Sequence, residues 1–196
     1  MQRPLPTGRR LLRGKRRPIW IQGFTIMALL LAMGQRAQAA PESANEYSVK
    51  AAFLFHFAQL TTWPPRIFTS TGSPLVFCTI GKDPFGGVLD SAVENKIVQG
   101  HPAKVLHLKQ VIGLEGCHLL FIGTQEMPRM PAIIAALHGL PVLTVGEADE
   151  FLKQGGMIDF RSQDDRLRFD VNLEAAQSSN LAFSSTLLSL ARTITR

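Results

Sequence analysis

The first 39 residues contain no acidic side chain, and this absence changes the meaning of the charge of the whole chain. The 196 residues have a formal net charge of +6. Eight of the 21 lysines and arginines lie in residues 1–39, so residues 40–196 hold 13 basic and all 15 acidic residues. A nucleic-acid-binding domain would carry a basic excess in its folded part. We therefore expect no nucleic-acid partner.

Residues 1–39 have the three parts of a secretory signal peptide. A cationic stretch ends at Arg17, an apolar run extends from Ile19 to Met33, and Ala37-Gln38-Ala39 forms a small-x-small cleavage site. The run of about 15 residues is shorter than the roughly 20 that cross a bilayer, which disfavours an uncleaved membrane anchor. We predict cleavage after Ala39, export to an oxidising compartment such as the periplasm, and a single domain over residues 40–196.

The exported part lacks the common catalytic and metal-binding motifs. Residues 81–87 lie where a phosphate-binding loop would lie, but Gly87-Val88 stands in place of the Lys-Ser/Thr pair that such a loop requires. The five histidines form no short-spaced metal-binding pair, and no Gly-x-Ser-x-Gly or Ser-x-x-Lys motif marks a nucleophile. We predict no enzyme, no cofactor and no metal site, while binding without hydrolysis at residues 81–87 remains an alternative.

Cysteine is scarce, and its two positions are informative. Cys78 lies inside the apolar run 75–80, and Cys117 directly precedes the apolar run 118–122. Two cysteines in an exported chain favour a single disulfide, and the alternative is a pair of buried free thiols. Because there is no Cys-x-x-Cys motif, we do not expect a catalytic thiol.

Strand-like and helix-like segments alternate along residues 40–196. Ser43-Ala44-Asn45-Glu46 matches a capping box and predicts a helix that begins there and stops at Trp63-Pro64-Pro65. The predicted strands that follow are 75–80, 104–108, 118–122, 141–145 and 181–184, and the predicted helices are 88–95, 131–138, 148–154 and 185–196. Residues 156–160 and 167–172 predict an antiparallel hairpin. This order predicts an α/β single-domain layered sandwich with a mainly parallel sheet, a C-terminal antiparallel hairpin and helices on both faces.

The predicted hairpin concentrates polar side chains. Strand alternation places Arg166, Arg168, Asp170 and Asn172 on one face, and Arg161 lies in the turn before them. Such a face is commonly the solvated side of an edge hairpin. Alternatively, it binds an anionic ligand or a protein partner, with the arginines as anchors.

An ordered set of segments extends over nearly all of residues 40–196. These segments are 47–57 with Trp63-Pro64, 78–85, 142–146, 155–158, 167–173 and 184–191. In this order they resemble the YfiR-like family of periplasmic proteins. The resemblance implies that Cys78 and Cys117 form one of the family's disulfides, whereas Leu152 and Asp159 stand where its second pair would lie.

The resemblance also implies a regulator without catalytic activity. YfiR-like proteins bind the periplasmic sensory domain of an inner-membrane diguanylate cyclase, hold the enzyme off, and so lower cyclic di-GMP and biofilm formation. An outer-membrane lipoprotein relieves the repression, and a homodimer is the expected state. The alternative function is a periplasmic protein that binds a small anionic ligand, at residues 81–87 or at the face of Arg166 to Asn172.

Overall fold

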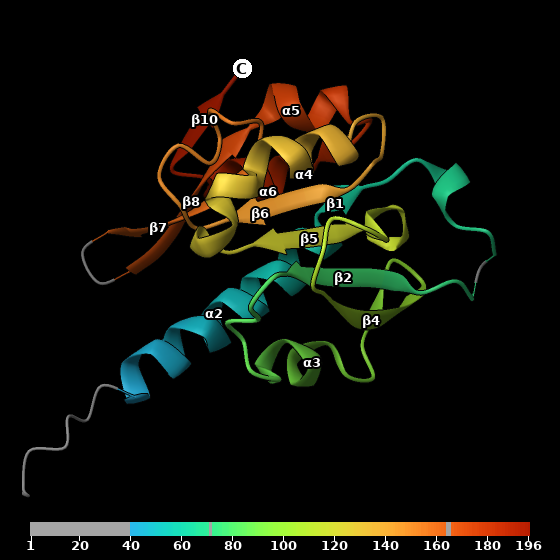
Figure 1. Ribbon diagram of the computed structural model, residues 1–196. Helices are drawn as coiled ribbons and strands as arrows, with labels where there is room; N and C mark the ends of the chain where they lie inside the picture. The colour runs from blue at the N-terminus through green and yellow to red at the C-terminus, as the bar shows by residue number, and fades with distance from the viewer. Residues whose placement is uncertain (1–39, 71, 164–165) are drawn as a thin grey trace, which may run out of the picture. The chain divides into compact units, whose positions relative to one another are not determined.

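The computed structural model describes residues 40–70, 72–163 and 166–196, which include the whole predicted domain apart from three residues (Figure 1). The predicted signal peptide, residues 1–39, lies outside the described residues. The described helices are α2 (Ala40–Gln59), α3 (Val88–Val93), α4 (Met130–Ala136), α5 (Leu173–Ser178) and α6 (Ser185–Leu190), with 3-10 turns at Pro65–Ile67, Leu114–Gly116 and Thr124–Arg129. The described strands are β1 (Thr61–Thr62), β2 (Leu75–Ile80), β3 (Ile97–Val98), β4 (His101–Leu108), β5 (Leu119–Ile122), β6 (Leu143–Gly146), β7 (Ile158–Gln163), β8 (Arg166–Asn172), β9 (Ala182–Phe183) and β10 (Thr193–Thr195).

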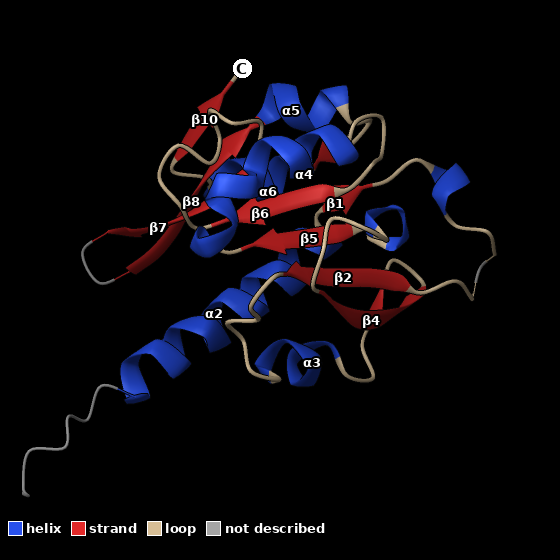
Figure 2. Ribbon diagram, viewed as in Figure 1, coloured by secondary structure: helices blue, strands red, loops and turns tan. Residues whose placement is uncertain are grey.

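Eight of these strands form one sheet, with the order β10-β8-β7-β6-β5-β2-β4-β3 (Figure 2). Neighbours from β7 to β4 pair in parallel, as does β10 with β8, whereas β7 with β8 and β3 with β4 are antiparallel. Strands β1 and β9 form a separate antiparallel pair. The predicted α/β class, mainly parallel sheet and C-terminal hairpin are confirmed.

The central strands are buried on both faces, so their side chains alternate between two hydrophobic cores. In β5, Leu119 and Phe121 join the core that contains α2 and α3, while Leu120 and Ile122 join the core beneath α4. Figure 1 accordingly shows α2 and α3 on one side of the sheet and α4 on the other. Helices therefore cover both faces, as predicted, and continuous apolar runs such as 118–122 are explained by two-sided burial.

The predicted start of the first helix is wrong. Helix α2 already includes Ala40, so Ser43 lies inside the helix and not at its N-cap. Glu46, the other end of the supposed capping box, forms an ion pair with Lys50 one turn later.

The helix predicted over residues 148–154 is also wrong. This segment forms successive turns, and Glu150 interrupts them with a φ of 66°, which no α-helix accommodates. The turns bury the ring of Phe151 between Gly146 and Gly156. A Cβ atom at Gly146 or Gly156 would lie 2.5 or 2.2 Å from that ring, so both positions require glycine.

The helix predicted over residues 185–196 is only half correct. Helix α6 ends at Leu190, and β10 then pairs with Asp170, Val171 and Asn172 of β8. The backbone N–H of Arg192 donates to the carbonyl of Phe169 at 2.8 Å, which begins this pairing. Without β10, β8 would have an unpaired edge, and the hydrogen bonds offered there compete with extension of α6. Strand β10 therefore forms this edge of the sheet in place of β8.

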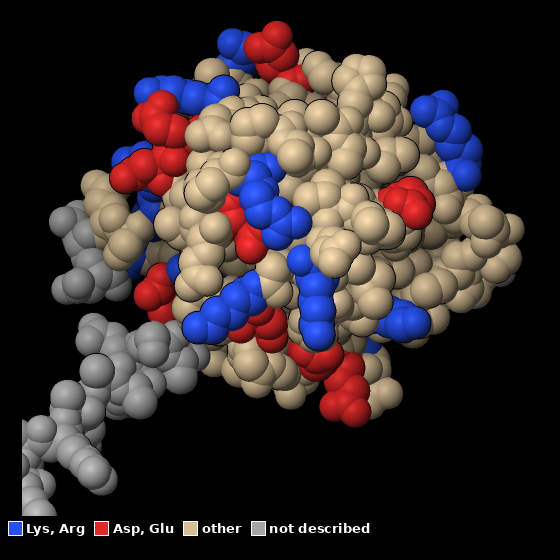
Figure 3. All heavy atoms as spheres, viewed as in Figure 1, with Lys and Arg blue, Asp and Glu red and all other residues tan. Residues whose placement is uncertain are grey.

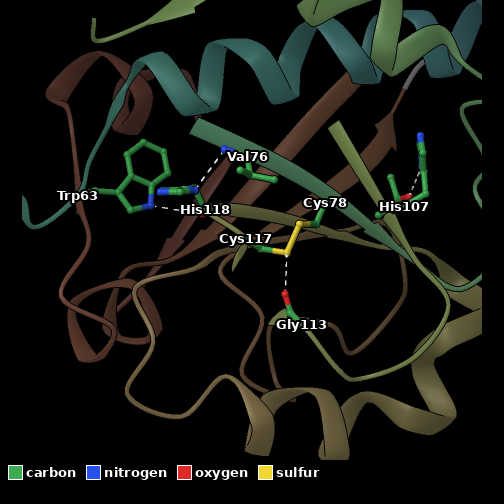
Figure 4. The surroundings of a disulfide bond; sticks show 8 residues. Trp63, Val76, Cys78, His107, Gly113, Cys117 and His118 are labelled. Atoms are coloured by element: carbon green, nitrogen blue, oxygen red, sulfur yellow. Dashed lines mark hydrogen bonds between the residues drawn. A yellow bond between two sulfur atoms is a disulfide. The ribbon is translucent and has the colours of Figure 1, made fainter. Parts of the chain in front are cut away.

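The disulfide between Cys78 and Cys117 is present and lies in the core beneath α4 (Figure 4). Its Cα atoms are 5.8 Å apart, and both residues are buried. Next to Cys117, the ring Nδ1 of His118 accepts a hydrogen bond from the Val76 backbone at 3.1 Å. The covalent bond and this hydrogen bond both join the start of β5 to β2.

Loss of the disulfide should destabilise the domain strongly. The bond closes a segment with a sequence separation of 39, which corresponds to about 4 kcal/mol of unfolding free energy in the chain-entropy model. We expect the free energy of unfolding of the double variant Cys78→Ala, Cys117→Ala, measured in urea, to be lower by that amount. Thiol titration of the unfolded, unreduced protein should detect no free thiol. Two free thiols per chain would contradict the pairing.

Candidate functional site

The structure divides the five polar residues of the hairpin into two groups. Asp170 and Asn172 have structural partners: Asp170 is buried beside Arg192, and the Asn172 side chain caps α5 by accepting from the Ala175 N–H at 3.0 Å. Arg166 and Arg168 are exposed and make no ion pair with any other described residue. The exposed arginines are therefore the part of the face that is available to a partner.

Arg161 belongs to a charge cluster that sequence reasoning did not assemble. Its guanidinium contacts Asp149 at 2.6 Å, Asp159 at 2.5 Å and Asp170 at 3.8 Å. Arg192 forms a bidentate contact with Asp170: its Nε donates to Oδ1 at 2.9 Å, and its Nη2 donates to Oδ2. Three carboxylates thus share two arginines, and the cluster has one negative charge more than it can neutralise.

Asp159 is the carboxylate of this cluster whose negative charge is least compensated. Its side chain is 0% exposed, and neither carboxylate oxygen has a hydrogen bond of good geometry despite the contact with Arg161. Burial raises the pKa of Asp159 to about 7; Arg161 opposes this shift, and Asp170 and Asp149 add to it. Burial also raises the pKa of Asp170, but the hydrogen bonds and charge of Arg192 outweigh that effect and leave it lowered.

A groove extends along α2 beside the hairpin and α6. Its first part, of about 440 Å³, is lined by Asn45, Glu46, Val49, Phe53, Ser162, Arg166 and Leu167. Its second part, of about 460 Å³, shares Val49 and Phe53 and adds Ala52, His56, Phe57, Leu60, Phe169, Leu187 and Leu190. We call the two parts together the α2 groove. Val49 and Leu190 are 40% and 60% exposed, so the groove presents apolar surface with Arg166 at its polar end.

A second cluster joins α2 to the C-terminal end of β6. Lys50, only 5% exposed, contacts Glu147 at 2.6 Å and lies over the ring of Tyr47. The Tyr47 hydroxyl donates to the other oxygen of Glu147 at 3.0 Å. Burial and the charge of Glu147 raise the pKa of Tyr47, so its hydroxyl remains a donor. Residues about 100 positions apart in sequence are held together here.

Two classes of site are absent from the described part of the chain. Residues 40–70, 72–163 and 166–196 contain no group of three or more His, Cys, Asp or Glu side chains that could hold a metal ion. Among the helices described there, none is long and apolar enough to cross a membrane. On the face shown in Figure 3, basic and acidic side chains are interspersed and form no large patch of one sign.

Sequence reasoning missed the partners of these charges for a simple reason. Glu147 and Arg192 belong to no local motif, and their partners Lys50 and Asp170 come from other elements of the fold, whereas Asp159 contacts Arg161 two residues along β7. The available signal was weak: an aspartate within the apolar run 157–160 is expensive to bury and so implies a nearby cation. That signal does not indicate which arginine supplies the charge.

The raised pKa of Asp159 should make stability depend on pH. Between the ordinary pKa of 3.8 and about 7, the folded state binds a proton that the unfolded state does not, so stability falls as pH rises through 7. Between pH 6.5 and 8, the free energy of unfolding measured in urea should fall by about 1 kcal/mol more in the unaltered protein than in Asp159→Asn.

The pH range for this comparison avoids an opposing effect. Burial and the neighbouring His101 lower the pKa of His118 to about 4, so His118 destabilises the fold as pH falls below 6.5. Glu150→Gln is the matched control, because the Glu150 side chain is 57% exposed and its ion pair is with Lys153, outside this charge cluster. It should keep the pH dependence of the unaltered protein. Parallel stability curves for the unaltered protein and Asp159→Asn would contradict the prediction.

Two solved structures are distantly similar to the chain. A conserved domain protein from Vibrio cholerae O1 biovar eltor strain N16961 aligns with a TM-score of 0.46 at 8% identity, over 61% of this chain and 54% of that chain. The ABC domain in complex with L-Trp from Streptococcus pneumonia aligns with a TM-score of 0.48 at 8% identity, over 74% of this chain and 60% of that chain. The chain thus spans little more than half the length of these structures, and neither similarity indicates a function.

Comparison with protein families is more informative. No curated protein matches the chain. The model of the YfiR/HmsC-like family matches residues 47–192. This range begins at Tyr47, which donates to Glu147, and ends at Arg192, which donates to Asp170. The match therefore includes α2 from Tyr47 onward, the disulfide, the hairpin and both charge clusters. The chain belongs to the YfiR/HmsC-like family.

Proposed function

We propose that the exported domain is a non-enzymatic regulator that binds the periplasmic sensory domain of an inner-membrane diguanylate cyclase and represses it. The observation that carries the proposal is the family match over residues 47–192. Cleavage of the signal peptide after Ala39 would release the domain into the periplasm, where its disulfide is stable. Relief by an outer-membrane lipoprotein and self-association as a homodimer belong to the same proposal.

We assign to the cyclase the α2 groove together with the adjoining part of the hairpin, where Arg166 lines the groove and Arg168 follows on β8 outside the groove lining. Interfaces are centred on apolar surface and anchored by arginines, and this region combines both. Val49 and Leu190 supply exposed apolar surface, and the two arginines have no described ionic partner. An acidic rim on the sensory domain would complement them.

Deletion of the gene should raise cellular cyclic di-GMP, because the cyclase would lose its repressor. Expression of the full chain from a plasmid should restore the low level, and cyclic di-GMP is measured by mass spectrometry of cell extracts. Deletion of the cyclase as well should remove the effect. Unchanged cyclic di-GMP after deletion of the regulator, in a strain that contains the cyclase, would refute the proposal.

Charge reversal should locate the interface. The variant Arg166→Glu, Arg168→Glu should bind the purified sensory domain at least about tenfold more weakly, because it removes two anchors and adds like charge. The matched control Lys104→Glu, Lys109→Glu makes the same change in net charge at exposed positions at and just beyond β4, several strands away in the sheet order. Equal affinities of the two variants in calorimetry would exclude this surface.

A further inference from the structure

Strand β4 has an outer edge that is only partly paired. Its inner edge pairs with β2 from Ala103 to Leu108, whereas on its outer edge β3 pairs only with His101 and Pro102. The last contact on the outer side is the Ala103 N–H, which donates to the Lys96 carbonyl at 2.9 Å. Beyond it, no strand of the described ranges pairs with β4, which lies past β2 at this end of the sheet (Figure 1). Residues 104–108 therefore form an open edge.

The backbone of this edge offers hydrogen bonds to a further strand. The N–H of Gly81 donates to the Leu108 carbonyl at 2.8 Å, so the backbone of Leu108 faces β2. Successive residues of a strand direct their N–H and C=O groups to opposite sides, so those of Val105 and His107 face away from β2. A row of outward N–H and C=O groups is a template on which an extended segment pairs.

The side chains beside the open edge combine apolar surface with a positive charge. His107 contacts Asp90 of α3 at 3.1 Å, so strand alternation places Lys104 and Leu106 on the face away from α3. Ile97 pairs with the residue two positions before Lys104, and its side chain therefore lies on the same face. Leu106 and Ile97 are 38% and 66% exposed. Apolar side chains thus lie on both sides of a lysine.

The charge of this region restricts the partner. Residues 96–109 contain three lysines, two histidines and no acidic residue. Lys96, Lys104 and Lys109 are exposed and make no ion pair with any other described residue. If two copies of the chain paired through this edge, two sets of three lysines would come together, which is unfavourable. An acidic segment would instead complement these charges.

We propose that the outer edge of β4 binds an extended acidic segment of another protein, which adds to the sheet as a further strand. The segment exchanges backbone hydrogen bonds with Val105 and His107. Its acidic side chains pair with Lys104 and Lys109, and an apolar side chain packs on Leu106. None of residues 96–109 lines the α2 groove, so the domain has a docking site separate from the surface assigned to the cyclase.

Peptide binding to the purified exported protein tests the proposal. Lysines at a sheet edge can also serve only to prevent pairing, in which case no peptide binds. The probe is an acetylated and amidated peptide of alternating glutamate and valine, about seven residues long to match a typical strand. In calorimetry it should bind at least about tenfold more tightly than the same peptide with lysine in place of glutamate.

A fully N-methylated version of the probe separates strand pairing from charge attraction. It keeps the glutamates but has no backbone N–H donor, so it should bind at least about tenfold more weakly than the unmodified peptide. Absence of binding by the glutamate-valine peptide would refute the proposal. Equal affinity of the N-methylated peptide would also refute it, because charge alone would then account for binding.

Charge reversal assigns the binding to the edge of β4. The variant Lys104→Glu, Lys109→Glu should bind the glutamate-valine peptide at least about tenfold more weakly, because it replaces two attractive charges with repulsive ones. The matched control Arg166→Glu, Arg168→Glu makes the same change in net charge at exposed positions of β8 and should bind the peptide normally. Equal affinities of the two variants would contradict the assignment. The probe is a peptide, so this result does not depend on the proposed cyclase.

Discussion

Strands β2 and β5 are buried on both faces, and the described fold is built outward from this pair. Their alternating side chains supply two separate cores, one shared with α2 and α3 and the other with α4. The Cys78–Cys117 disulfide and the His118 to Val76 hydrogen bond join the two strands on the side where β5 begins. Close packing of both faces leaves little freedom in the register of these strands.

This rigid pair has consequences at the opposite end of the sheet. The loops that follow β2 and β5 diverge from these strands and, with Tyr47 and Glu147, line a crevice of about 400 Å³. Gly81 and Glu126 are in direct contact there, and the Lys50–Glu147 pair adds a further wall.

The hairpin illustrates how polar residues of similar appearance come to have different roles. Alternation along β8 was predicted correctly, yet Asp170 is buried because β10 brings Arg192 over it. Asn172 is occupied by the cap of α5, whereas Arg166 and Arg168 remain exposed. Proximity along a strand predicted a shared face, but it could not predict which members of that face the rest of the chain would cover.

The sequence by itself determined the order of most elements, the two-sided burial of the central strands and the covalent pairing of the only two cysteines. These features follow from local periodicity and from composition, which act over a few residues. The tertiary structure alone decided that residues 148–154 form turns around Phe151, that residues 193–195 form a strand, and that Glu147 meets Lys50 and Asp170 meets Arg192. Each of these depends on an available strand edge, a space for an aromatic ring or a buried opposite charge, and such contacts form only when distant segments pack together.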